Sequence, residues 1–134
     1  MYKGGCLCGA VRFFITGPIR NIVYCHCSRC RRAQGSAFAT NGIVAADDFE
    51  ITKGAQNLTT YHSMPGKKKQ FCRTCGSPIL STNSATPDVV RVRIGTIQSP
   101  IEERPMAHIF AASKADWETI ADDLPQYPEY EPGR

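Results

Sequence analysis

The chain has 134 residues, 42% of them hydrophobic, and this length fits one globular domain against a prior of roughly 100 to 200 residues per domain. No run of about 18 apolar residues is present to cross a bilayer, and the N-terminus lacks the blocks of a signal peptide. We therefore expect no membrane-spanning or secreted protein, and we expect the chain to be cytoplasmic. Lysine and arginine outnumber aspartate and glutamate by 16 to 12, and the formal charge of +4 hints at an anionic partner.

Short β-branched or aromatic runs, separated by Gly, Pro, Asn and Asp clusters, predict a mainly β protein built from short antiparallel strands. Strands are predicted over residues 11–15, 19–24, 37–44, 49–52, 58–62, 69–71, 79–82 and 89–94. In the last of these, Arg91 and Arg93 alternate with apolar residues. This alternation indicates an arginine face that is exposed to solvent.

Two segments have the pattern of a short helix. Residues 28–34 can form one or two turns that end at Gly35, and the backbone N–H groups of such a helix would point at nearby cysteines. Residues 113–116, Ser-Lys-Ala-Asp, resemble a capping box ahead of Trp117 and Ile120, and they predict a second short helix.

The C-terminal residues 125–134 carry three prolines and are expected to be an extended or partly disordered tail. No internal repeat and no shift in composition divides the remaining chain. We therefore expect a single domain over residues 1–124, followed by this proline-rich tail.

Seven cysteines are the strongest chemical signal in the sequence. An odd number cannot pair completely within the chain, so a pure disulfide framework is not expected. All seven lie in three short motifs, Cys6-Leu-Cys8, Cys25-His-Cys27-Ser-Arg-Cys30 and Cys72-Arg-Thr-Cys75. Cysteines one or two residues apart let a tight turn present two sulfurs to one ion, and tetrahedral thiolate sites are typical of zinc.

The count of seven suggests one site of four cysteines and one of three. Four thiolates close a tetrahedron, whereas three leave a position for water or substrate, which is the usual difference between structural and catalytic zinc. We assign the structural site to Cys6, Cys8, Cys72 and Cys75, and the open site to Cys25, Cys27 and Cys30. Spacing alone also allows Cys8 to join the triplet, or His26 or His62 to be its fourth ligand.

The cysteines allow two other interpretations. Buried free thiols can serve as small hydrophobic residues, but seven of them in CxC and CxxC arrangements argue against this interpretation. The CxxC pairs could instead cycle between thiol and disulfide. No thioredoxin-like βαβ pattern surrounds either motif, so metal binding is the preferred interpretation.

The motifs resemble those of the glutathione-dependent formaldehyde-activating enzyme (GFA) family, whose domain is shared with centromere protein V. The resemblance is carried by Gly5-Cys6-Leu-Cys8-Gly9, Cys25-His-Cys-Ser-Arg-Cys-Arg31, Gly35-Ser-Ala-Phe38 and Phe71-Cys-Arg-Thr-Cys-Gly76, with a C-terminal pattern around Pro105, His108, Lys114, Trp117 and Leu124. It implies an Mss4-like zinc fold with a four-cysteine structural zinc and a three-cysteine second zinc, which agrees with the partition reached from the residues.

The resemblance also implies an activity, the condensation of glutathione with formaldehyde to S-hydroxymethylglutathione by a carbon–sulfur lyase. In the mechanism that we expect, zinc is held by Cys25, Cys27 and Cys30, and the glutathione sulfur takes the fourth position and adds to the aldehyde carbon. His26 and His62 are candidates to move the proton. Arg31, Arg32 and Lys67, with their neighbours Arg29, Lys68 and Lys69, are candidates to bind the carboxylates of glutathione.

A binding module of the zinc-ribbon type, with both zincs structural and a protein or nucleic acid as partner, is the alternative. The aromatic residues do not interleave with the basic ones as a base-stacking platform requires. Seven thiolates and two Zn²⁺ ions would also lower the formal charge from +4 to +1. We therefore do not expect nucleic acid as a partner, and a homo-oligomer is compatible with the sequence.

Overall fold

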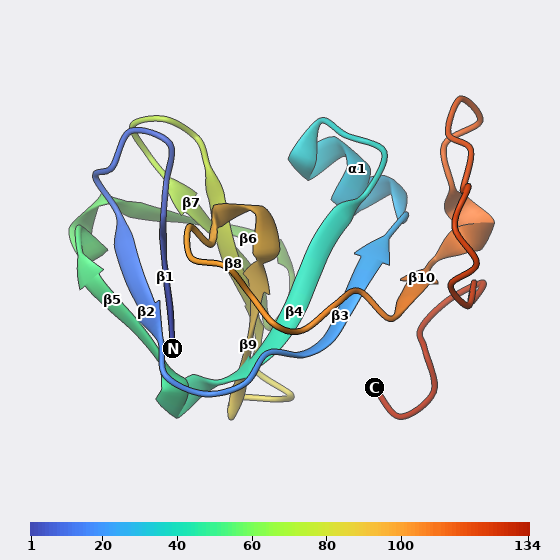
Figure 1. Ribbon diagram of the computed structural model, residues 1–134. Coiled ribbons are helices and arrows are strands. Elements are labelled where there is room, and N and C mark those ends of the chain that lie inside the picture. Colours follow the sequence, from blue (N-terminus) through green and yellow to red (C-terminus); the bar gives the residue numbers. More distant parts are fainter.

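A computed structural model describes residues 1–134 as two β-sheets and one α-helix (Figure 1). The smaller sheet is antiparallel and has the order β1-β2-β5, with β1 at Tyr2–Gly5, β2 at Arg12–Ile15 and β5 at Phe49–Lys53. The larger sheet has the order β10-β3-β4-β9-β8-β7-β6. Its strands are β3 (Arg20–Cys25), β4 (Ala39–Ala45), β6 (Leu58–Met64), β7 (Lys67–Cys72), β8 (Pro78–Asn83), β9 (Val89–Arg93) and β10 (Ala107–Ile109). The prediction of a mainly β fold is confirmed.

The main hydrophobic core lies where the two sheets pack together. Phe13 and Ile15 alternate with partly exposed residues along β2, and they belong to the same buried cluster as Val44 of β4 and Val92 of β9. Each of these side chains is at most 1% exposed. Removing one of them would cost about 2–5 kcal/mol, so the cluster fixes how the strands are placed relative to one another.

A second, smaller cluster lies at the edge of the larger sheet. It consists of Val23, Cys25, Ala107 and Ile109, with Cys27 and Cys30 packed against it. Strand β10 pairs in parallel with β3, with Ile109 opposite Cys25, and the His26 N–H donates to the Ile109 carbonyl at 2.9 Å. The cysteine triplet is therefore attached to the end of β3 and held there by β10.

The helix α1 spans Ser28–Gln34, as the sequence predicted. Gly35 ends it in the left-handed conformation at φ 62°, with its N–H donating to the Arg31 carbonyl at 2.7 Å. None of its residues is buried, so no packed apolar face fixes its position. No helix in the structure has the length and hydropathy that are needed to span a membrane.

The predicted C-terminal helix is wrong. Ser113 ends a single 3-10 turn, and no helix follows it. The Lys114 ammonium donates to the carbonyls of Ala115 and Glu118. These two carbonyls therefore bond to a side chain and not to the backbone N–H groups of a helix. Trp117 is 68% exposed, so the apolar contact that would support such a helix is missing.

The C-terminal residues 125–134 lie along β10, which the sequence analysis did not predict. The His108 N–H donates to the Pro125 carbonyl, and the Tyr127 N–H donates to the His108 carbonyl, both at 2.9 Å. Glu131 is only 3% exposed and forms an ion pair with Arg134. The tail is extended, as expected, and it packs against the rest of the chain; that residues 1–124 form a domain of their own stays a prediction.

Candidate functional site

The four cysteines that were assigned to one site lie together. Cys6 and Cys8 follow β1, while Cys72 ends β7 and Cys75 lies in the turn to β8. Their sulfurs are all within 4.8 Å of one another, with 3.7 Å between Cys6 and Cys8 and 3.8 Å between Cys8 and Cys72. Sulfurs at 2.3 Å from a tetrahedral ion are about 3.8 Å apart, so this spacing fits zinc.

Hydrogen-bond donors contact three of these four sulfurs. The Val11 N–H donates to the Cys6 sulfur at 3.2 Å, and the Asn57 side-chain amide donates to the Cys72 sulfur at 3.1 Å. The Ser77 hydroxyl, with the Ser77 N–H, lowers the pKa of Cys75 to about 5. The backbone of Ala10 lowers the pKa of Cys8, but burial and the neighbouring thiols outweigh it and raise this pKa to about 11. Because a thiol binds zinc as a thiolate, it is the donors at Cys72 and Cys75 that suit a metal site.

The second cluster consists of Cys25, Cys27 and Cys30, whose sulfurs also lie within 4.8 Å of one another. Cys25 is the last residue of β3, and Cys27 is the N-cap of α1, where its sulfur accepts from the Cys30 N–H at 3.3 Å. Hydrogen bonds from the Cys25 and Cys30 thiols, together with this N–H, lower the pKa of Cys27. Hydrogen bonds with Cys27 and Cys30 raise the pKa of Cys25. Among the three thiols, Cys27 is therefore the one that most readily becomes a thiolate.

The alternative ligand sets that spacing left open are not found. Cys8 lies with Cys6, and no histidine joins either group of ligand atoms. His62 lies exposed on β6. The partition into four and three cysteines therefore agrees with the structure.

His26 belongs to a row of three contacting side chains that leads to the C-terminal segment, with His26 and His108 buried and Asp122 exposed. It is 0% exposed, its Nε2 lies 2.8 Å from Nδ1 of His108, and Nε2 of His108 lies 2.9 Å from the Asp122 carboxylate. Burial lowers the pKa of His26, and the positive charge of a protonated His108 would lower it further. His26 lines neither of the two large cavities described next.

A cavity of about 750 Å³ opens onto the cysteine triplet, and its wall includes all three cysteines. Seven lysine and arginine side chains line it, and no aspartate or glutamate does. These cations come from α1, the β6–β7 hairpin, β9 and the C-terminal tail: Arg29, Lys67, Lys68, Lys69, Arg91, Arg93 and Arg134. The cavity thus combines sulfur ligands with a strongly positive surface.

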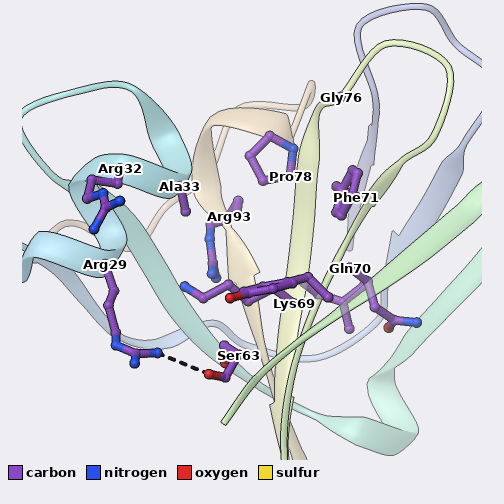
Figure 2. Close-up of a pocket in the computed structure, with 12 residues that line it drawn as sticks. Arg29, Arg32, Ala33, Ser63, Lys69, Gln70, Phe71, Gly76, Pro78 and Arg93 are labelled. Atoms are coloured by element: carbon purple, nitrogen blue, oxygen red, sulfur yellow. Dashed lines mark hydrogen bonds between the residues drawn. The ribbon is translucent and has the colours of Figure 1, made fainter.

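A second cavity, of about 610 Å³, adjoins the first between α1 and strands β6–β8. Figure 2 shows Arg29, Arg32 and Ala33 on the α1 side, Lys69, Gln70 and Phe71 along β7, and Arg93 between them. Arg29, Ser63, Lys69 and Arg93 line both cavities, so the two spaces meet at these residues.

The expectation of a solvated arginine face on β9 is wrong for Arg93, which is only 6% exposed. Its Nη1 donates to the Ser81 hydroxyl at 3.3 Å, while its Nε has no partner. Its cross-strand neighbour Asn41, 7% exposed, also has an unpartnered side-chain oxygen. Neither residue is recognisable as a site residue from the local sequence, because their burial depends on the central position of β4 and β9 in the larger sheet.

The cations predicted to bind substrate lie at different places. Arg32 lines the smaller cavity and Lys67 the larger one. Arg31 lines neither: its guanidinium donates to the carbonyls of His26 and Ser113, at 3.4 and 3.3 Å. Arg31 therefore links the start of α1 to the C-terminal segment.

The fold and its two cysteine clusters define a mainly β, cysteine-rich protein whose clusters have the spacing of metal sites. The family model "Glutathione-dependent formaldehyde-activating enzyme" matches residues 1–113. The chain therefore belongs to this family, which confirms the resemblance found in the motifs.

Individual relatives agree with this assignment. A protein of Halomonas elongata, provisionally named a glutathione-dependent formaldehyde-activating enzyme, is 30% identical over 129 residues, which cover 90% of this chain and 81% of that protein. A protein of Phaeosphaeria nodorum with the same provisional name is 25% identical over 80 residues, covering 56% of this chain and 42% of that protein. The crystal structure of a Rhodobacter sphaeroides protein superposes with a TM-score of 0.63 at 29% identity, covering 74% of this chain and 90% of that one.

Proposed function

We propose that the protein catalyses the addition of a thiol to a small aldehyde, with glutathione and formaldehyde as the pair that the family name implies. In this reaction S–H adds across C=O: sulfur bonds to the aldehyde carbon, and the proton ends on the former carbonyl oxygen. Neither an oxidant nor a reductant is consumed. The reverse reaction breaks a carbon–sulfur bond, so the proposed class is a carbon–sulfur lyase.

The observation that supports this function most is the difference between the surroundings of the two clusters. Cys25, Cys27 and Cys30 line a large positive cavity, whereas none of the other four cysteines lines either large cavity. A small anionic ligand can therefore reach the triplet. A site that only stabilises the fold has no need for such an opening.

Both clusters have donor sets that suit zinc, and we propose one ion in each. The four-cysteine set would hold a structural ion, and the triplet would leave one coordination position free. When bound at the triplet, zinc would supply the positive charge that keeps a substrate thiol deprotonated. Clusters of reduced thiols also favour a reducing compartment, so we propose that the protein acts in the cytoplasm.

Several of the protein's own side chains would then bind and orient the substrate. Arg32 and Lys67 are proposed to attract its carboxylates. His26, which contacts His108 and lines neither cavity, is proposed as a positioning residue that fixes the junction of β3 and α1. Arg31 would support the same junction through its two backbone contacts.

The alternative, a zinc-ribbon-like binding module for protein or nucleic acid, receives less support. Many of the basic residues line the two concave cavities, where a small anion fits better than a macromolecular backbone. A steep loss of RNA or DNA affinity with rising salt would favour this alternative.

The test is the rate of adduct formation in the zinc-loaded protein. Two-dimensional NMR exchange spectroscopy measures how fast glutathione and S-hydroxymethylglutathione interconvert at equilibrium. We expect the wild type to accelerate the exchange above the spontaneous rate and Cys27→Ser to return it to that rate. The control is Arg20→Gln, because Arg20 is exposed and lines neither cavity. Wild-type exchange at the spontaneous rate would refute the proposed function.

A further inference from the structure

The smaller cavity has a surplus of positive charge that no residue of the chain neutralises. Arg29, Arg32, Lys69 and Arg93 all line it, and no acidic side chain does. The protein contains one arginine–glutamate ion pair, Arg134 with Glu131, and a contact between His108 and Asp122, and neither involves these four cations. The remaining wall is partly apolar, with Tyr61, Phe71 and Leu80 among its residues.

Among these four cations, Arg93 carries the largest free-energy cost of burial. A guanidinium that is only 6% exposed has lost most of its hydration, and a buried charge is normally compensated by a partner of opposite sign. Its neutral contacts to Ser81 and to the Arg91 carbonyl, at 3.3 and 3.5 Å, do not supply one, and its Nε has no partner. Burial accordingly lowers the pKa of Arg93, although the nearby thiols of Cys30 and Cys25 oppose this effect when they are ionised.

The cysteine triplet cannot neutralise all of these charges. Three thiolates with one Zn²⁺ carry a single negative charge, whereas Arg29, Lys69 and Arg93 alone carry three positive charges at the junction of the two cavities. At least two positive charges therefore remain for an external anion.

The side chains at this junction are held in place. The Arg29 guanidinium donates to the Ser63 carbonyl at 3.1 Å and so bridges α1 to β6, as the dashed line in Figure 2 shows. Arg93 is fixed by its position in β9, between β4 and β8 of the larger sheet. Rigid cationic side chains lose little entropy when they bind a carboxylate, and a guanidinium can bind both carboxylate oxygens at once.

We propose that the smaller cavity is the subsite for a carboxylate of the thiol substrate, with Arg93 as its buried anchor and Arg29, Arg32 and Lys69 around it. This inference rests on the proposed function, because it assumes that the sulfur of the same molecule lies at the triplet. The substrate class is a short peptide-like thiol with a carboxylate near the sulfur-bearing residue. Because Arg29, Lys69 and Arg93 line both cavities, a molecule whose sulfur lies at the triplet meets the subsite where the two cavities join.

The subsite makes Arg93 a determinant of specificity. A thiol whose carboxylates are masked as esters would leave the guanidinium buried and unpaired. Hydrogen bonds to charged groups contribute about 1.5–3 kcal/mol, which corresponds to roughly a 10- to 150-fold loss of affinity.

The experiment is isothermal titration calorimetry on the zinc-loaded full chain. The probes are S-methylglutathione, which keeps both carboxylates but has no free thiol, and its diethyl ester. We expect the ester to bind the wild type at least tenfold more weakly than the acid. Arg93→Gln should weaken binding of the acid by a similar factor and narrow the difference in affinity between acid and ester, whereas Arg20→Gln should behave like the wild type.

Fold and metal content are checked in each variant by circular dichroism and zinc stoichiometry. If Arg93→Gln does not fold, the comparison of acid and ester on the wild type, and on the charge-retaining Arg93→Lys, still decides the matter. If the carboxylate dependence is found but formaldehyde exchange is not accelerated, the subsite stands and the proposed reaction fails. Equal affinity of the wild type for acid and ester would overturn the subsite, even if the exchange is accelerated.

Discussion

The two cysteine clusters should respond differently to the same chemical change, cysteine to serine. Cys72 is 0% exposed and belongs to the main hydrophobic core, where its sulfur accepts from Asn57. Structural zinc contributes about 10–16 kcal/mol to folding in small metal sites, which is comparable with the whole stability of a domain, about 5–15 kcal/mol. Cys72→Ser should therefore abolish most of the folded state.

Cys27→Ser should be much milder. Cys27 is partly exposed and caps α1 through the Cys30 N–H, and a serine at an N-cap can accept the same hydrogen bond. The triplet packs against a cluster of only four buried residues, not against the main core. We expect a loss of about 1–2 kcal/mol, or about 3–10 °C in Tm, with the activity abolished.

The assay combines thermal unfolding by circular dichroism with zinc analysis of the purified protein. Wild type should hold two zinc ions per chain, and Cys27→Ser should hold one and still unfold cooperatively. Cys72→Ser should lack a cooperative transition. Equal destabilisation by the two substitutions would refute the division into a structural and a catalytic site.

Three further outcomes are expected. Gly35→Ala places a side chain at φ 62°, so Tm should fall by an amount equivalent to about 1 kcal/mol, while zinc content stays at the wild-type value; an unchanged Tm would contradict the assigned helix end. The hydrogen bond with His108 lowers the pKa of Asp122 in the folded protein. This bond therefore stabilises the fold at pH values above the pKa of Asp122 in the unfolded chain, and the stabilisation is lost as the pH falls through the pKa of Asp122 in the folded protein. Asp122→Asn should lower Tm at pH 7 and make Tm less sensitive to acid, and an identical pH profile would exclude this contact as a source of stability. A limiting amount of chelator should remove the triplet's zinc first, with activity lost before the circular dichroism signal changes; simultaneous loss of both would argue that the triplet is also structural.

Most of the larger sheet was predictable, because its strands carry β-branched residues between clear turn signals. The grouping of the cysteines was also predictable, since short spacings within each motif limit which sulfurs can meet. The local sequence pattern predicts a structure correctly where the contacts that stabilise it lie within a few residues of one another.

Two strands were missed because their formation depends on distant partners. Strand β10 has only three residues and forms against β3 and the C-terminal tail. Strand β1 contains Gly4 and Gly5, which favour a turn by propensity. A Cβ at Gly4 would lie 2.3 Å from the Phe13 ring, so that glycine is required by a contact across the sheet. Neither contact is visible in the local sequence.

The role of the charged residues was the least predictable part of the site. The alternation of Arg91 and Arg93 with valines indicates one solvated face, yet Arg93 is buried on the face of the sheet where α1 lies. Likewise, Arg31 and Arg32 are adjacent in sequence, but only Arg32 lines a cavity. Neighbouring side chains on the seven-residue helix α1 point in different directions, and only the tertiary structure shows which of them faces the cavity.

The most direct test of an open metal site at the triplet is a thiol titration of the protein with Co²⁺ in place of zinc. The visible spectrum of Co²⁺ reports the atoms bound to the ion. Glutathione should change the spectrum of the wild type saturably and leave that of Cys27→Ser, with only the four-cysteine site filled, unchanged. A wild-type spectrum that glutathione does not alter would contradict the claim that Cys25, Cys27 and Cys30 leave a position for a substrate thiol.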